Sequence, residues 1–259
     1  MFAIIIILIV ALIVLAIMVN AFQQHKEKVE AEKRTELSKQ KAIIDETENV
    51  IMSASQSQIP ISPMLNLILL KRIQGALKLT HELNPKTPEI KQRLNDIAER
   101  IKMNEADAEK NKAAAADGIS LPDNDKQIIV TIQSLKKLRA LLRTEHSKGK
   151  VSAQVFIGED KRLDKMQLRV NVDTLARRAD SAIQSQMMGS ARQYLEKAIV
   201  ALTNFSTQDE YVTSRRAQLE QQLSQIQENL RNSNAEDTAR RIEDERNELD
   251  ELFAPKKKW

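Results

Sequence analysis

The amino-acid sequence predicts an all-α protein in which a single N-terminal transmembrane helix is followed by helical hairpins and long charged, coiled-coil-like helices. Three observations support this prediction. Residues 1–22 form an apolar run without a charged residue. The 259-residue chain contains only five Gly and six Pro, and it is rich in residues that favour helix. Apolar residues beyond the run recur mostly at intervals of three and four, as on amphipathic helices.

The segment 1–22 reads MFAIIIILIVALIVLAIMVNAF. A helix needs about 20 apolar residues to cross the hydrocarbon core of a bilayer, so this segment is predicted to be a membrane anchor. A cleaved signal peptide is an alternative, because Val19-Asn20-Ala21 resembles a weak cleavage site. However, no basic residue precedes the apolar core, and the core is longer than in signal peptides. A buried core helix is the other alternative, but the polar remainder offers little to cover it.

Basic residues flank only one side of the predicted anchor. None precedes it, whereas Lys26, Lys28, Lys33 and Arg34 follow it closely. Because flanking Lys and Arg favour the cytoplasmic side, the N-terminus is predicted outside and the body in the cytoplasm. For a bacterial protein this would be the inner membrane. The absence of Cys agrees with a reducing compartment.

Residues 23–58 contain no Pro or Gly and continue the anchor as a helical stalk with a partly buried end. Residues 64–116 are predicted to form a helical hairpin. Ser62 can cap its first helix, with Pro63 in the first turn, and Asn84-Pro85 ends that helix. Thr87-Pro88 starts the second helix by the same logic. Residues 117–125 are predicted to be a linker.

Residues 126–232 are predicted to form a second helical region, beginning with a helix over 126–147. Two interpretations stay open for 151–175. Alternating apolar residues would suit a β-hairpin that turns at 158–160, whereas the charged stretch 160–168 favours a helix broken near Gly158. We favour the helix, because an isolated hairpin is only marginally stable in water.

Helices are then predicted over 175–186, 189–204 and 209–230. The sequence Ser233-Asn234-Ala235-Glu236 fits a capping box, which would open a separate charged helix over 233–254. Residues 255–259 form a basic tail that ends in Trp259. This tail would either touch the inner leaflet or act as a solubilising end.

The chain resembles itself when it is shifted by about 122 residues. Ile73 then aligns with Leu195, Ala76 with Ala198, and Ile97 with Leu219. The match is imperfect, since Leu94 falls on Arg216. Two helical hairpins with the same apolar spacing are therefore predicted, and such units tend to stack on one another.

One of these hairpins resembles a tetratricopeptide repeat. Small residues at Ala176, Ala179 and Ala182 are followed by Gly189 and by the sequence Ala191-x-x-Tyr194-Leu195-x-Lys197-Ala198. The usual aromatic residue early in the first helix is absent, and Ser206-Thr207 stands where the family has Pro. The resemblance implies closely packed helical hairpins with a concave face that binds a peptide or helix of a partner protein.

No constellation of catalytic residues stands out in the sequence. His25, His81 and His146 lie far apart and lack metal-ligand spacing. No phosphate-binding glycine motif or nucleophile elbow occurs. We therefore expect no enzyme activity, metal or cofactor. Lys136, Lys137, Arg139 and Arg143 would suit RNA or anionic lipid. Without interleaved aromatic residues they are more typical of a solvated helix face, so nucleic acid is not the expected partner.

The leading functional hypothesis is a single-pass membrane-anchored scaffold or adaptor that recruits a protein to the cytoplasmic face. Two alternatives are a self-assembling coiled-coil membrane protein, which would be a homo-oligomer, and a membrane tether for RNA or ribosomes. Residues predicted to build or line the partner site, the first three rather as core, are Leu69, Ile73, Leu77, Tyr194, Leu195 and Tyr211.

Overall fold

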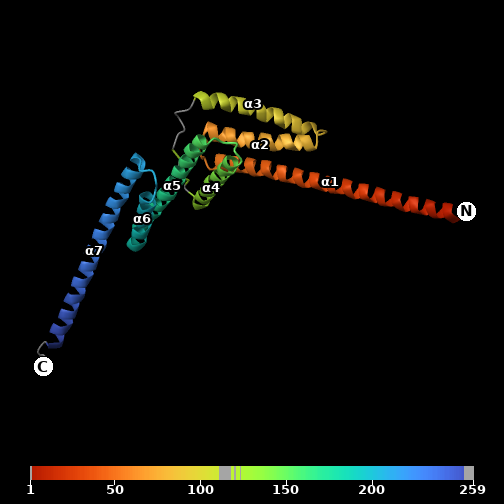
Figure 1. Cartoon of the computed structure of the whole chain (residues 1–259). Coiled ribbons are helices and arrows are strands. Elements are labelled where there is room, and N and C mark those ends of the chain that lie inside the picture. Colours follow the sequence, from red (N-terminus) through yellow and green to blue (C-terminus); the bar gives the residue numbers. More distant parts are fainter. Residues whose placement is uncertain (1, 111–117, 120, 123, 254–259) are drawn as a thin grey trace. The chain divides into compact units, whose positions relative to one another are not determined.

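The structure, a computed structural model, describes residues 2–110, 118, 119, 121, 122 and 124–253. Within the helices it leaves the side chains of 2–11, 13, 14, 107–110, 233, 245 and 247–253 undescribed. All secondary structure in the described residues is helical, which confirms the all-α prediction (Figure 1). The helices are α1 (Phe2–Gln56), α2 (Pro63–Leu83), α3 (Pro88–Lys110), α4 (Asp125–Ser147), α5 (Ala153–Gln184), α6 (Met188–Thr203) and α7 (Glu210–Phe253).

Predicted caps fix the ends of the first hairpin. The Ser62 hydroxyl accepts a hydrogen bond from the Leu65 amide at 3.0 Å, and Pro63 is the first residue of α2. Asn84 ends α2, and α3 begins at Pro88. In the predicted linker, Asp117, Ser120 and Asp123 lie outside the described residues.

Residues 153–175 are helical, and the predicted break near Gly158 is wrong. Helix α5 passes through Gly158 and continues to Gln184, so the helix predicted over 175–186 is its last part. Its buried residues form two helical stripes, one of them through Leu168, Val172 and Ala176 and the other through Met166 and Val170. Burial on both faces produces the apparent alternation at 168, 170 and 172, which in the sequence resembles a strand.

The predicted capping box at 233–236 does not start a new helix. Helix α7 is continuous from Glu210 to Phe253, because neither Pro nor Gly interrupts this stretch. An unbroken run of helix formers gives the chain no physical reason to stop at Ser233. The separate helices predicted over 209–230 and 233–254 are therefore one helix.

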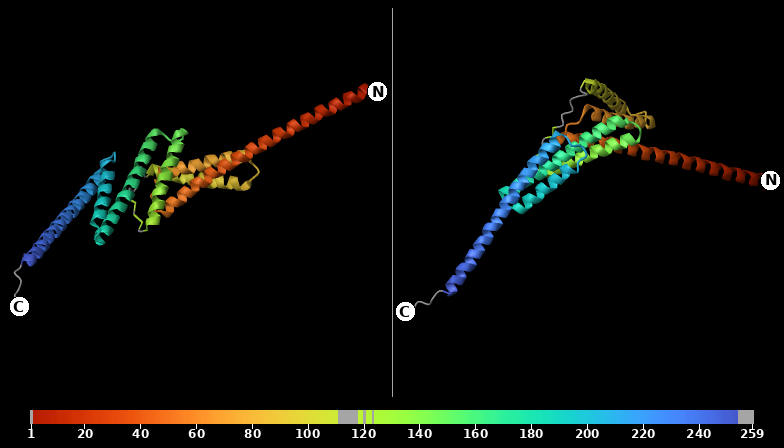
Figure 2. Two further views of the ribbon diagram at one scale, coloured as in Figure 1. Left: turned by 90° about the horizontal axis from the view of Figure 1, so that it is seen from below. Right: turned by 60° about the vertical axis from the view of Figure 1, so that its left-hand side comes forward.

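The chain divides into two compact units. Unit 1 comprises Met1–Gly118 and Gln133–Leu163, and unit 2 comprises Ile119–Ile132 and Asp164–Trp259. In unit 1, α2 packs against both α1 and α3, and these helices stay adjacent in every view (Figure 2). In unit 2, α6 packs against α7.

Each unit has its own apolar core, built from three consecutive helices. In unit 1, α1, α2 and α3 share a core of Ile44, Leu67, Leu70, Ile73, Ala76, Leu77, Ile97 and Ile101. In unit 2, α5, α6 and α7 share a core of Leu168, Val172, Ala176, Ala179, Ala182, Ala191, Leu195, Ala198, Leu202, Val212, Leu219 and Ile226. The residues that align in the predicted repeat thus occupy corresponding places in the two cores.

Among the residues whose side chains are described, no helix has a stretch both long enough and apolar enough to cross a membrane. Residues 1–11, 13 and 14 of the predicted span lie outside this set.

Candidate functional site: a groove between α1, α2 and α3

The six residues predicted for the partner site fall in both units. Leu69, Ile73 and Leu77 are buried on α2 in unit 1. In unit 2, Leu195 is buried, whereas Tyr194 and Tyr211 are half-buried and pack on the core. The described parts of two separate hollows include only two of these residues, Ile73 in unit 1 and Tyr211 in unit 2.

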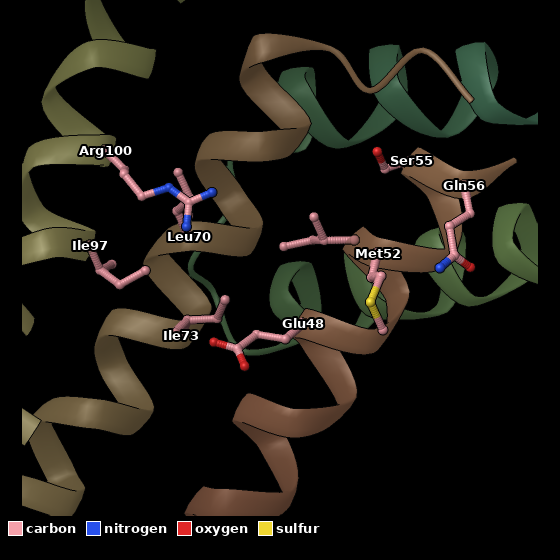
Figure 3. Close-up of a pocket in the computed structure, with 9 residues that line it drawn as sticks. Glu48, Met52, Ser55, Gln56, Leu70, Ile73, Ile97 and Arg100 are labelled. Atoms are coloured by element: carbon pink, nitrogen blue, oxygen red, sulfur yellow. The ribbon is translucent and has the colours of Figure 1, made fainter. Parts of the chain in front are cut away.

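The hollow in unit 1 is an apolar groove of about 370 Å³ that is lined by three helices (Figure 3). Helix α2 supplies the floor with Leu70 and Ile73, α1 forms one wall, and Ile97 belongs to the wall from α3. The residues that line the groove are Glu48, Ile51, Met52, Ser55, Gln56, Leu70, Ile73, Ile97 and Arg100. Met52 is 54% exposed, so a flexible apolar side chain stands at the opening.

The two charged residues that line the groove differ in whether they form an ion pair. The guanidinium of Arg93 on α3 donates to the Glu48 carboxylate on α1 at 2.6 Å, so this pair joins the two walls. Arg100 is exposed and makes no ion pair with any described residue. The lining therefore carries one carboxylate that is already neutralised and one guanidinium that has no counter-charge among the described residues.

A buried charge network connects α2 with α1 and α4 in unit 1. Arg72 on α2 donates from Nε to the Thr47 hydroxyl at 3.0 Å and from Nη2 to Glu46 at 2.8 Å. Its Nη1 donates to Glu145 on α4 at 2.5 Å. Three helices thus meet at one side chain that is only 6% exposed.

The carboxylate of Glu145 stays ionised within this network. Burial alone would raise the pKa of Glu145, but hydrogen bonds and positive charge from Lys148 and Arg72 outweigh it and hold the pKa below its usual value of 4.5. Lys148 lies 3.0 Å from one carboxylate oxygen, and Lys150 lies 3.6 Å from the other. The only acidic residue in the second half of α4 therefore has a structural role.

The basic residues noted on α4 divide into two groups. Arg139 donates to both oxygens of Asp160 at 3.0 and 3.1 Å, and Arg143 lies 3.5 Å from the same carboxylate. The Arg139 hydrogen bond is the main reason that the pKa of Asp160 lies below its usual value. Lys136 and Lys137 are exposed and have no ion pair within the described part of the chain. Two of the four cations thus fasten α5 to α4.

The hollow in unit 2 is polar, with a volume of about 420 Å³, and is lined by Lys165, Arg169, Asp209, Glu210, Tyr211 and Ser214. Lys165 and Asp209 form an ion pair at 2.7 Å, and Asp209 also accepts from the Val212 amide and so caps α7. The Arg169 guanidinium lies 4.4 Å from the centre of the Tyr211 ring. These contacts tie α5 to the start of α7.

Tyr211 remains protonated in this hollow. Burial and the negative charge of Asp173 raise the pKa of Tyr211 to about 12, against the nearby positive charges of Arg215 and Arg169. Its hydroxyl makes no hydrogen bond of acceptable geometry within the described part of the chain, although Asp173 lies near enough to act on the pKa of Tyr211. The charged side chains of this hollow therefore mostly interact with one another. The surface of the hollow is less apolar than that of the groove.

Several groove residues were not among the predicted site residues. Ile97 aligns with Leu219 in the predicted repeat, but Met52 and Arg100 carry no sequence signal of their own. A helical wheel of 48–56 places 48, 51, 52, 55 and 56 on one face. This spacing is the sequence feature that could have indicated a common surface on α1.

In the described part of the chain, no three His, Asp or Glu side chains gather closely enough to hold a metal ion. His146 stacks on Phe156 with ring centres 4.2 Å apart, which is a packing role. Comparisons of the chain with protein-family models, with curated proteins and with solved structures give no match.

Proposed function

We propose that this chain is a membrane-anchored adaptor whose groove between α1, α2 and α3 recruits a partner protein to the cytoplasmic face of the membrane. The observation that carries the proposal is the groove itself, which is apolar and open. One wall of the groove belongs to the same continuous helix, α1, that begins with the apolar residues 2–22. One helix would thus connect the anchor with the binding site.

Uncovered apolar side chains support the membrane part of the proposal. In the described part of the segment, six large apolar residues are between 49% and 73% exposed, namely Leu12, Leu15, Ile17, Met18, Val19 and Phe22. Exposed apolar surface on this scale calls for a membrane or a protein partner. The basic residues Lys26, Lys28, Lys33 and Arg34 favour a cytoplasmic body.

The stalk would set the distance between the membrane and the groove. From Phe22 to Gln40, the first described residue of α1 that is buried, the helix has no Pro or Gly. At 1.5 Å per residue this segment is about 27 Å long. Attachment by a stalk of this kind raises the local concentration of a partner at the membrane without any new contact.

Membrane topology is the first test. The chain has no Cys, so Lys86→Cys places a single thiol in the exposed turn between α2 and α3. We expect a membrane-impermeant maleimide to label this thiol in lysed cells and not in intact cells. Labelling in intact cells would place the body outside and overturn the orientation, and recovery of the chain in the soluble fraction would overturn the anchor.

The groove is tested by photo-crosslinking in cells, with Met52→Glu beside the unaltered chain. Met52 is exposed, so a charge there should block an apolar partner without unfolding the core. Met103→Glu is the matched control, since Met103 is 67% exposed on α3 and does not line the groove. A crosslinked partner lost with Met52→Glu and kept with Met103→Glu supports the proposal, whereas equal capture by all three chains contradicts it.

Self-assembly is a second candidate function, which the C-terminal part of α7 favours. From Arg231 to Asp244 every described side chain of this helix is exposed. An exposed helix of this length would gain stability from pairing with a second copy. Analytical ultracentrifugation in detergent discriminates the two functions, because a chain that stays monomeric at high concentration excludes the self-assembly role.

A further inference from the structure

We propose that the occupant of the groove is an amphipathic α-helix of the partner protein, which places a carboxylate beside Arg100. This inference rests on the adaptor function proposed above and names the chemistry of its partner. The bound helix would be the fourth helix of a bundle with α1, α2 and α3.

The arrangement of the walls favours a helix as the occupant. Helices α1 and α3 run in the same direction on either side of α2, which runs in the opposite direction (Figure 1). On α1 the lining residues are Glu48, Ile51, Met52, Ser55 and Gln56, which follow the spacing of one helical face over two turns. On the other helices the lining pairs, Leu70 with Ile73 and Ile97 with Arg100, are also three residues apart. Such ridges receive the side chains of another helix.

The backbone chemistry of the groove points to the same occupant. The lining residues all belong to helices, whose N–H and C=O groups are bonded within each helix away from its ends. An extended peptide in an apolar groove would leave its own backbone groups without partners, which costs free energy. A helix satisfies these groups internally and presents only side chains to Ile51, Met52 and Ile97.

The charge of the occupant follows from the pairing of the groove charges. Arg93 already neutralises Glu48 across the two walls at 2.6 Å. Arg100 has no counter-charge among the described residues, and Figure 3 shows its guanidinium directed toward α2 at the groove. A docked helix would remove water from this guanidinium, so an acidic residue on the facing side would compensate the lost solvation.

The test is a selection from a display library of amphipathic helical peptides, in which positions beside a fixed apolar stripe are randomised. The target is the full chain in lipid nanodiscs. We expect the selection to enrich Asp or Glu at one flanking position. Sequences that contain a central Pro should be depleted, because Pro interrupts the helix. Against Arg100→Glu the same selection should favour Lys or Arg there, and acidic peptides from the first selection should bind at least about tenfold more weakly.

Lys102→Glu is the matched control, because Lys102 is exposed on α3 and does not line the groove. Peptides that bind Lys102→Glu as they bind the unaltered chain support a specific role of Arg100. Enrichment without charge preference, unchanged binding to Arg100→Glu, or no peptide that depends on Met52 overturns the inference.

These outcomes separate the inference from the adaptor function itself. A partner crosslinked in cells in a Met52-dependent way, together with a failed peptide selection, keeps the adaptor and rejects the acidic helix. Loss of both rejects the adaptor as well. If the chain self-associates in nanodiscs and Met52→Glu abolishes that association, the occupant is a second copy and a separate partner is excluded.

Discussion

The helices α1, α2 and α3 in unit 1 share a sequence pattern with residues 164–184 of α5 and with α6 and α7 in unit 2, but the two sets present different surfaces. With the shift of about 122 residues, Val50 aligns with Val172 and Ala54 with Ala176, and all four are buried. Helix α3 begins at Pro88 and α7 at Glu210, which are separated by the same shift. The aligned positions are therefore buried in both units.

The faces that correspond to the groove differ. Ile51, Met52, Ser55 and Gln56 on α1 align with charged or polar residues on α5, namely Asp173, Thr174, Arg177 and Arg178. In unit 2 these residues have local partners. Asp173 pairs with Arg215 at 3.1 Å, the Arg177 guanidinium donates to the Pro122 carbonyl at 2.8 Å, and Arg178 lies 3.3 Å from Asp125. The aligned face is thus occupied in unit 2 and open in unit 1, which is why the proposed binding site lies in unit 1.

The aligned core positions give the largest expected effects. Ile73→Ala and Leu195→Ala should each lower the unfolding free energy by about 3 to 4 kcal/mol, because each removes a fully packed aliphatic side chain. Hydrogen exchange measured by mass spectrometry should show faster exchange mainly in α1–α3 for the first variant and mainly in α5–α7 for the second. Equal acceleration in both units for either variant would mean that the two cores unfold together.

The Arg72 network distinguishes unit 1 from unit 2, because Arg72 aligns with Tyr194 in the repeat. Arg72→Met should cost about 3 kcal/mol, because removal of one partner leaves the buried Glu145 carboxylate poorly compensated. Lys148 and Lys150 limit the loss. Urea denaturation measures it, with Arg93→Met as the control. That substitution breaks an exposed pair and should cost less than about 1 kcal/mol. Similar losses for both variants would contradict a special role for the buried network.

Acid should weaken unit 1 through Glu145. Its folded pKa lies below the ordinary value of 4.5, so the ionised carboxylate stabilises the fold above that pH, and the contribution is lost as pH falls through the folded pKa. We expect the unfolding free energy of the unaltered chain to fall more steeply below pH 4.5 than that of Glu145→Gln, measured by urea denaturation at several pH values. Parallel pH profiles would show that Glu145 is not stabilised in the folded state.

Base should weaken unit 2 through Tyr211. Its folded pKa is about 12, above the ordinary value of 10.0, so its stabilising contribution is complete below pH 10 and is lost as pH rises toward 12. The chain has two Tyr, and Tyr194→Phe leaves Tyr211 as the single phenol. Absorbance at about 295 nm should then titrate near pH 12 in the folded chain. A midpoint near 10 would show that the folded chain does not shield the Tyr211 hydroxyl from water.

The comparison of the units also explains which features could be predicted from the sequence. Caps and prolines, such as Ser62 with Pro63 and Asn84 with Pro85, act through local geometry, so the bounds of α2 and the start of α3 were predictable. The continuity of α5 through Gly158 is accompanied by tertiary contacts just beyond it, such as the bonds of Glu159 with Ser62 and of Asp160 with Arg139, which local patterns do not reveal. The groove depends on which side of α1 stays uncovered, and therefore on tertiary packing around Met52.

The smallest expected effect on stability belongs to the substitution that tests the comparison most directly. Met52→Thr gives α1 the residue that α5 carries at the aligned position 174. Because Met52 is 54% exposed, the unfolding free energy should change by no more than about 0.5 kcal/mol. Binding of a selected groove peptide should nevertheless weaken by about tenfold, since the change removes the long apolar side chain at the opening. Fluorescence anisotropy measures binding, and Met103→Thr is the control. Unchanged affinity in Met52→Thr would mean that the open face of α1 is not where unit 1 binds, and the contrast with unit 2 would then concern folding alone.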